Sequence, residues 1–417
     1  MDSILIHGGV ALQGKVRIQG SKNAALPILA ATLLTKETSF IRNCPKIADV
    51  YGMMNLLKSL GCTVSREEKG IRINSKRICC GEMPAEAVKG MRSSLCLLGA
   101  LLGRCGEIVM EYPGGCVIGE RPIDLHLKAL EKMGVEFSEE DGRIHGIARK
   151  LHGACIRLPF VSVGATENVL MAAVMAEGET VIEGAAKEPE VVALCEYLRC
   201  CGAVIEGEGT GRIRILGGNA LYGADYMVPA DRIVAGTYLF AAVAAGGEVF
   251  LEEAPAMQMD DILYAAEQMG ASCSITGGGI YIQAPGRPVL LEKVCTEPYP
   301  GFPTDLQSAV LVANTVGDGS CLIEETIFEN RFRVVEPLKR MGADITVLDE
   351  RHVLIKGVHK LCGRQVEAKE LRGGAALVLA GLMAQGETRV SGCRFIERGY
   401  ENICKDLREL GARITGV

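Results

Sequence analysis

The sequence lacks the features of several special classes of protein. It contains 45 Lys and Arg against 51 Asp and Glu, so it has no basic surplus of the kind that nucleic-acid-binding proteins show. No apolar stretch reaches the roughly 18 residues of a membrane-spanning helix, because Gly, Lys, Arg or Glu interrupts each one. The N-terminus shows no basic leader followed by an apolar stretch and a cleavage site. We therefore expect a cytoplasmic protein that binds neither nucleic acid nor membrane.

Regular cysteine spacing is also missing. The 17 cysteines form no framework, and the pairs Cys79-Cys80 and Cys200-Cys201 are adjacent rather than separated by two residues as zinc ligands often are. Most of the remaining cysteines stand in apolar surroundings. We expect mainly buried free thiols in a reducing compartment, and no bound metal.

An internal repeat runs through all 417 residues. A Leu- or Met-rich helix that ends in Gly and leads into a short alternating strand occurs six times, at intervals of 73, 68, 68, 72 and 69 residues. Glycine is favoured just after a helix, where the backbone turns left-handed. The six glycines are Gly61, Gly134, Gly202, Gly270, Gly342 and Gly411.

A second pattern precedes each of these glycines. It is an Ala/Leu-rich helix, a turn and an alternating strand, as in 170–182 and 377–390. Each copy therefore reads as strand, helix, strand, helix, strand, strand. Three copies of about 70 residues make a domain of ordinary size, so the sequence predicts an α/β protein with two domains of about 200 residues.

Polar or charged residues stand at the start of the first helix in every copy. For any one copy, ordinary helix capping explains them. Four of the copies, however, place Lys or Arg there, where a cation opposes the helix dipole, and such locally unfavourable choices mark functional sites. We predict a set of cations around a phosphate- or carboxylate-bearing ligand, between the two domains. The six positions are Lys22, Arg92, Gly164, Arg232, Asp305 and Arg372.

One loop, residues 112–122, lies outside the repeat. Three glycines and two prolines exclude a helix or a central strand there and favour a mobile loop able to act as a lid. The loop carries Cys116, and Arg121 nearby would favour its thiolate form. Composition alone leaves a catalytic cysteine and an incidental loop thiol equally open.

Motifs spread over the whole chain resemble those of the enolpyruvyl transferases, and in particular of those members that act on UDP-N-acetylglucosamine. The loop cysteine separates these members from the shikimate-phosphate enzymes. The motifs are Gly20-Ser21-Lys22-Asn23, Pro113-Gly114-Gly115-Cys116, Arg121-Pro122-Ile123-Asp124-Leu125, Ser162-Val163-Gly164, Asp231-Arg232, Pro303-Thr304-Asp305, Glu329-Asn330-Arg331-Phe332, Leu371-Arg372 and Arg398-Gly399-Tyr400.

The resemblance implies a fold and a reaction. The fold is two inside-out α/β barrels of three repeats each, one formed by residues 22–229 and the other by 1–21 plus 230–417, with the active site in the cleft between them. The reaction moves the enolpyruvyl group of phosphoenolpyruvate to the 3-hydroxyl of UDP-N-acetylglucosamine and releases phosphate, with no cofactor. This is the first committed step of peptidoglycan precursor synthesis. The resemblance implies a monomer or a weak homo-oligomer.

The resemblance also implies roles for individual residues. Cys116 would serve as general acid or assist product release, and it could also attack phosphoenolpyruvate covalently. Asp305 would accept the hydroxyl proton, and cations would hold phosphoenolpyruvate. The implied catalytic residues are Lys22, Asn23, Cys116, Asp305 and Arg398. The implied substrate-binding residues are Arg92, Arg121, Pro122, Ile123, Asp124, Leu125, Ser162, Val163, Gly164, Ile327, Arg331 and Arg372.

The sequence departs from the family pattern at several positions. These departures leave open a divergent paralogue with weak or regulatory activity, and a 3-phosphoshikimate 1-carboxyvinyltransferase is a further alternative. The departing positions are Glu120, Phe160, Val234, Val334 and Gly373-Gly374.

Overall fold

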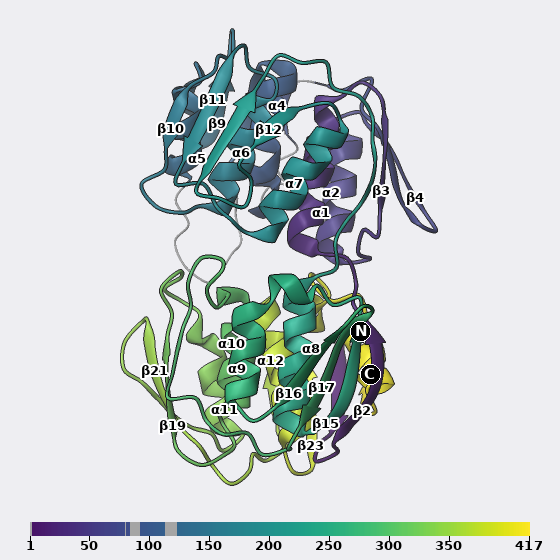
Figure 1. Ribbon diagram of the computed structural model, residues 1–417, viewed down its shortest axis with the longest axis vertical. Helices are drawn as coiled ribbons and strands as arrows, with labels where there is room; N and C mark the ends of the chain where they lie inside the picture. The colour runs from purple at the N-terminus through teal and green to yellow at the C-terminus, as the bar shows by residue number, and fades with distance from the viewer. Residues whose placement is uncertain (1, 80, 84–91, 113–122) are drawn as a thin grey trace. The chain divides into compact units, whose positions relative to one another are not determined.

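The computed structural model describes residues 2–79, 81–83, 92–112 and 123–417. These residues form two compact units (Figure 1). We call residues 2–19 with 230–417 the terminal unit, and the described part of 20–229 the central unit. Each unit has its own hydrophobic core.

The central unit contains three four-stranded sheets. In each sheet the first pair of strands is parallel and the next two pairs are antiparallel. In spatial order the sheets are β14 (Asp225–Met227), β3 (Thr38–Arg42), β5 (Gly70–Asn74), β4 (Thr63–Glu67); β6 (Gly81–Glu82), β7 (Glu107–Glu111), β9 (Arg143–Ile147), β8 (Glu136–Glu140); and β10 (Cys155–Arg157), β11 (Glu179–Glu183), β13 (Arg212–Leu216), β12 (Val204–Glu206).

The terminal unit repeats this arrangement with three further sheets. The same parallel, antiparallel, antiparallel order of pairing holds in each. In spatial order the sheets are β2 (Leu12–Arg17), β15 (Gly247–Glu252), β17 (Gly279–Ala284), β16 (Ser272–Thr276); β18 (Lys293–Cys295), β19 (Ser320–Glu324), β21 (His352–Lys356), β20 (Asp344–Val347); and β22 (Gln365–Glu367), β23 (Glu387–Ser391), β1 (Ser3–His7), β24 (Arg413–Gly416).

The sheets confirm the repeat that the sequence predicts. Three copies run in chain order as strand, helix, strand, helix, strand, strand, and they begin at β6, β10 and β18. The other three copies are each completed by a strand from a distant part of the chain. Strand β14 supplies the edge of the first sheet, while β2 and β1 supply strands to two sheets of the terminal unit.

The first helix of each repeat is apolar on nearly all sides, and this explains why it lies inside its unit. In α8 (Arg232–Ala245) every residue from Arg232 to Ala244 is buried. The three sheets of a unit remain separate, so the described strands close no continuous barrel and the helices fill the interior. The corresponding helices are α10 (Gln307–Ala313) and α12 (Leu371–Met383) in the terminal unit, and α1 (Lys22–Ala31), α4 (Leu97–Cys105) and α6 (Val163–Ala173) in the central unit.

The second helix of each repeat is amphipathic or short, with one face toward the core. In the central unit these helices are α2 (Ala48–Ser59), α5 (Asp124–Glu131) and α7 (Pro189–Cys200). In the terminal unit they are α9 (Asp260–Gln268), α11 (Val335–Arg340) and the pair α13 (Cys393–Ile396) and α14 (Ile403–Glu409). Short 3₁₀ turns are η1 (Thr32–Leu34), η2 (Arg92–Cys96), η3 (Ala256–Gln258), η4 (Thr304–Leu306) and η5 (Phe332–Val334).

The six repeat glycines have the backbone that the sequence predicts. Their φ angles are positive and lie between 85° and 102°. Each glycine closes a helix and starts the turn into the third strand of its repeat, a conformation that is costly for any residue with a Cβ. Across the described ranges, no helix combines the length and the apolar character required to cross a membrane.

Candidate active site

Part of the predicted site lies outside the described residues. Cys116, Arg121 and Pro122 fall within 113–122, and the side chain of Arg92 is also not described. Their roles stay predictions. The remaining predicted residues each lie within one of the two units.

Asp305 lies in η4 of the terminal unit, where it forms ion pairs with two arginines. Arg331 donates to Asp305 Oδ1 at 2.7 Å, and Arg372 donates to Oδ2 at 2.9 Å. The side chains of Arg331 and Arg372 are only 3% and 6% exposed, whereas 25% of the Asp305 side chain is exposed. Two buried cations around one carboxylate make a positively charged cluster whose carboxylate is accessible to solvent.

This arrangement decides the protonation state of Asp305. Burial alone would raise the pKa of its carboxyl group, but the charges of Arg372 and Arg331 outweigh burial and hold the pKa well below the ordinary value of 3.8. Asp305 is therefore ionised at neutral pH. It is also a weak base for as long as both arginines hold it.

Glu325 brings a further predicted residue, Ile327, close to this cluster. Glu325 is fully buried and follows β19. It accepts a hydrogen bond from the Thr304 hydroxyl at 2.9 Å and another from the Ile327 amide at 2.9 Å. Thr304 is the neighbour of Asp305 in η4, so one buried carboxylate ties both segments together. Sequence reasoning did not identify Glu325, because nothing in its local pattern marks it.

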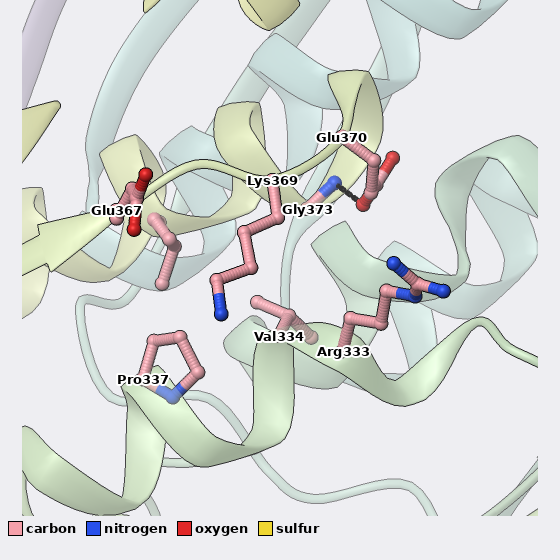
Figure 2. A pocket seen from close by; sticks show the side chains of 8 residues that line it. Arg333, Val334, Pro337, Glu367, Lys369, Glu370 and Gly373 are labelled. Atoms are coloured by element: carbon pink, nitrogen blue, oxygen red, sulfur yellow. Dashed lines mark hydrogen bonds between the residues drawn. The ribbon is translucent and has the colours of Figure 1, made fainter. Parts of the chain in front are cut away.

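Arg372 owes its place to the start of α12. Glu370 is the N-cap of this helix: its carboxylate accepts hydrogen bonds from the amides of Arg372, at 2.7 Å, and of Gly373. Figure 2 shows the carboxylate turned toward the Gly373 amide. A Cβ at position 373 would collide with this carboxylate. An acid at the N-cap offsets the unfavourable placement of Arg372 in the first turn.

Two departures from the family pattern, Val334 and Gly373, lie together beside this helix start. They line one small pocket (Figure 2). The sequence could not show that these positions are neighbours. The pocket is lined by Arg333, Val334, Pro337, Glu367, Lys369, Glu370, Gly373 and Leu377.

In the central unit, Lys22 and Asn23 open α1 behind the N-cap Ser21. Lys22 Nζ lies 2.8 Å from Asp49 Oδ2, and their side chains are 14% and 7% exposed. Asp49 lies in the first turn of α2 and offsets the positive charge of Lys22. Sequence reasoning missed Asp49, because an acid in the first turn of a helix is ordinary.

Two predicted segments of the central unit, 123–125 and 162–164, are close in space. Ser162 caps α6 by accepting from the Ala165 amide at 3.3 Å. The Asn168 side chain lies 3.0 Å from His126 Nδ1 and donates to the Gly164 carbonyl at 3.1 Å. A Cβ on Gly164 would lie only 2.9 Å from His126 Cε1. His126 follows directly after the first segment, so the close approach at Gly164 joins the two.

Arg398 lies in the turn after α13 and is half-buried. It belongs to the same unit as Asp305 and Arg372.

Among the residues described, no three His, Cys, Asp or Glu side chains are grouped as a metal site requires. The chemistry that these groups support is anion binding and proton transfer.

Solved structures define the class of this fold. The chain is similar to the enolpyruvyl transferase NikO from Streptomyces tendae, with a TM-score of 0.90, 23% identity and coverage of 99% of this chain and 98% of the other. It is also similar to an EPSP synthase from Acinetobacter baumannii, with a TM-score of 0.75, 20% identity and coverage of 100% and 99%. The fold is that of an enolpyruvyl transferase, as the motifs implied.

Sequence relatives then define the family. The family model for EPSP synthase (3-phosphoshikimate 1-carboxyvinyltransferase) matches residues 6–407, and the chain belongs to this family of transferases. A UDP-N-acetylglucosamine 1-carboxyvinyltransferase of Oleidesulfovibrio alaskensis is 46% identical over 100% of both chains. A UDP-N-acetylglucosamine 1-carboxyvinyltransferase 2 of Caldanaerobacter subterraneus is 44% identical, also over 100% of both. The resemblance that the motifs carried is confirmed.

Proposed function

We propose that this protein transfers the enolpyruvyl group of phosphoenolpyruvate to the 3-hydroxyl of UDP-N-acetylglucosamine and releases phosphate. The observation that carries the proposal is the cluster of Asp305, Arg331 and Arg372, two buried cations around a partly exposed carboxylate. It stands in a chain that is 46% identical, over its full length, to a relative named for this reaction.

Charge supports phosphoenolpyruvate as the donor substrate. Its phosphate and carboxylate together carry about three negative charges at neutral pH. Arg331, Arg372, Lys22 and Arg398 supply matching cations, together with Arg92 from the resemblance. Each hydrogen bond between charged partners contributes about 1.5–3 kcal/mol when it is shielded from water.

The reaction proceeds by addition and then elimination. In the addition, C3 of phosphoenolpyruvate gains a proton, for which Cys116 is the proposed donor. The sugar hydroxyl attacks C2 and gives up its proton to Asp305, the proposed base. In the elimination, C3 returns a proton to the Cys116 thiolate, the C2–O bond to phosphate breaks, and the proton held by Asp305 goes to the departing phosphate. The enolpyruvyl ether and inorganic phosphate are the products.

Asp305 must leave at least one arginine before it becomes an effective base. While both ion pairs hold, its pKa lies well below 3.8. We propose that the carboxylate of phosphoenolpyruvate replaces the Asp305 carboxylate in its contact with Arg372, because both groups accept hydrogen bonds from the same guanidinium. Loss of that contact raises the pKa of Asp305 toward the range of a useful base.

The proposed catalytic set draws on both units, Lys22 from the central unit and Asp305 from the terminal unit. The Cys116 loop belongs to this proposal as the carrier of the general acid. A monomer or weak homo-oligomer in the cytoplasm remains the expected state.

Phosphate release tests the proposal. The wild-type protein should release phosphate only when phosphoenolpyruvate and UDP-N-acetylglucosamine are both present. Arg372→Gln should lower kcat/KM about 10- to 150-fold, the loss that corresponds to one hydrogen bond between charged groups. Arg287→Gln is the matched control, since Arg287 is an exposed arginine of the same unit, paired with Asp318. It should leave kcat/KM unchanged.

Three outcomes separate the alternatives. Phosphate release only with shikimate 3-phosphate would favour the shikimate-phosphate reaction. Binding of UDP-N-acetylglucosamine without any turnover would favour a regulatory paralogue. An equal loss in Arg372→Gln and Arg287→Gln would remove the arginine cluster from the proposal.

A further inference from the structure

Arg372 has a second partner besides Asp305. Its Nη1 donates to the Tyr400 hydroxyl at 3.4 Å, and its guanidinium carbon lies 5.8 Å from the centre of the Tyr400 ring. Tyr400 is 2% exposed; the sequence marks it as part of the Arg398-Gly399-Tyr400 motif but gives it no role. One terminal nitrogen of the guanidinium thus donates to a carboxylate and the other to a buried hydroxyl.

The direction of the hydrogen bonds behind Arg372 follows from proton counting. The Thr237 hydroxyl donates its single proton to the Ile233 carbonyl in α8, at 2.8 Å. Its oxygen lies 2.8 Å from the Tyr400 hydroxyl and must therefore accept the Tyr400 proton. The lone pairs of the Tyr400 oxygen are left to accept from Arg372. Because the Tyr400 proton is directed at Thr237, the Tyr400 oxygen acts as an acceptor toward Arg372. A guanidinium requires an acceptor, since it can only donate.

Asp305 and Tyr400, the two partners of Arg372, differ in whether a bound substrate competes with them for the guanidinium. Asp305 is partly exposed and carries a charge, so a substrate carboxylate competes with it for Arg372. Tyr400 and Thr237 are both 2% exposed, lie in the core and keep their bonds in either case. Burial raises the pKa of Tyr400 above 10, so its hydroxyl stays neutral even beside a cation that favours ionisation.

We propose that Tyr400, supported by Thr237, is a positioning residue that holds the Arg372 guanidinium in place for the carboxylate of phosphoenolpyruvate. This inference rests on the proposed function. It assigns to Tyr400 a role in substrate affinity, separate from its packing in the core. The contact is made equally in the ground state and the transition state, so its loss acts on KM more than on kcat.

The test compares Tyr400→Phe with Tyr238→Phe. Tyr238 is the matched control: its ring centre lies 6.5 Å from that of Tyr400 in the same core, but its hydroxyl donates to Asp406 at 2.6 Å. Both variants lose one buried hydroxyl and keep the ring. With UDP-N-acetylglucosamine at saturation, Tyr400→Phe should raise KM for phosphoenolpyruvate about 10-fold and change kcat less than about 2-fold. Tyr238→Phe should leave that KM unchanged.

Thr237 variants extend the test along the same hydrogen-bond chain. Thr237→Ser keeps the hydroxyl and should keep the wild-type KM, whereas Thr237→Val removes it and should raise KM in the direction of Tyr400→Phe. Tm is measured for every variant, since a purely structural role would lower Tm without separating the two tyrosines in KM.

The outcomes distinguish this inference from the function on which it rests. An unchanged KM in Tyr400→Phe, with a wild-type enzyme that turns over, overturns the positioning role alone. An equal rise in KM for Tyr238→Phe also overturns it. Absence of any turnover by the wild type overturns the proposed function, and the positioning role falls with it.

Discussion

Glu167 is an acid in the middle of α6, only 4% exposed, inside the central unit. Burial is the main cause that raises its pKa, and the nearby charges of Glu190 and Glu188 raise it further, to about 8. The Cys96 thiol lies 3.9 Å from its carboxylate. Glu167 is therefore protonated at neutral pH in the folded protein.

This raised pKa predicts how stability depends on pH. In the unfolded chain Glu167 ionises near 4.5, whereas in the folded protein it keeps its proton up to about 8. The folded state thus binds more protons between these values, and its stability falls as pH rises through this window. Glu167→Gln keeps a neutral side chain at every pH. Its Tm should therefore fall less between pH 5 and pH 8 than the Tm of the wild type does.

Thermal unfolding at the two pH values measures this difference. Glu136→Gln, at an exposed position in β8, is the control and should keep the wild-type dependence on pH. If the Tm of Glu167→Gln falls as much between pH 5 and pH 8 as that of the wild type, Glu167 is not a buried neutral acid.

At the scale of the element, the repeat glycines isolate the effect of backbone conformation. Gly342 follows α11 with φ of 97°, and a Cβ added there would meet no atom within 4 Å. Gly342→Ala therefore creates no clash, and its cost comes from the left-handed backbone, about 1–2 kcal/mol. The variant should unfold at a lower temperature, by roughly 2–4 °C for each kcal/mol in a unit of this size.

Gly277→Ala is the matched control for this prediction. It lies in the same unit, its added Cβ would also meet nothing within 4 Å, and its φ is outside the left-handed range. Its free energy of unfolding should change by no more than that of an ordinary surface substitution, about 0.5 kcal/mol, so its Tm should stay close to that of the wild type. Equal changes in Tm for the two variants would show that the positive φ angle at Gly342 does not require glycine.

The elements show where sequence reasoning succeeds. Gly61 and its five counterparts are predictable because a local backbone requirement leaves a local mark. The order of strands in three of the sheets is not predictable in this way. Strand β14 completes a sheet whose other strands end at Asn74, and nothing within β14 itself specifies that partner.

The same limit applies to the site at the scale of the whole molecule. The helix starts marked Asp305 and Arg372 as polar positions, but they lie 67 residues apart, and their ion pair depends on how the helices pack. Glu325 could not be found from the sequence, and Tyr400 was marked only as part of a motif, because a buried acid and a core tyrosine acquire their roles from distant neighbours. The residue types of the site were predictable, whereas the contacts that set their charge and position were not.

The proposed reaction joins an enolpyruvyl group to UDP-N-acetylglucosamine. The most direct test supplies phosphoenolpyruvate with equal concentrations of UDP-N-acetylglucosamine and shikimate 3-phosphate, and identifies the products by mass spectrometry. We expect the enolpyruvyl ether of UDP-N-acetylglucosamine, one equivalent of phosphate for each ether formed, and no modified shikimate 3-phosphate. An enolpyruvyl product on shikimate 3-phosphate, or phosphate release with UDP-N-acetylglucosamine left unmodified, would contradict it.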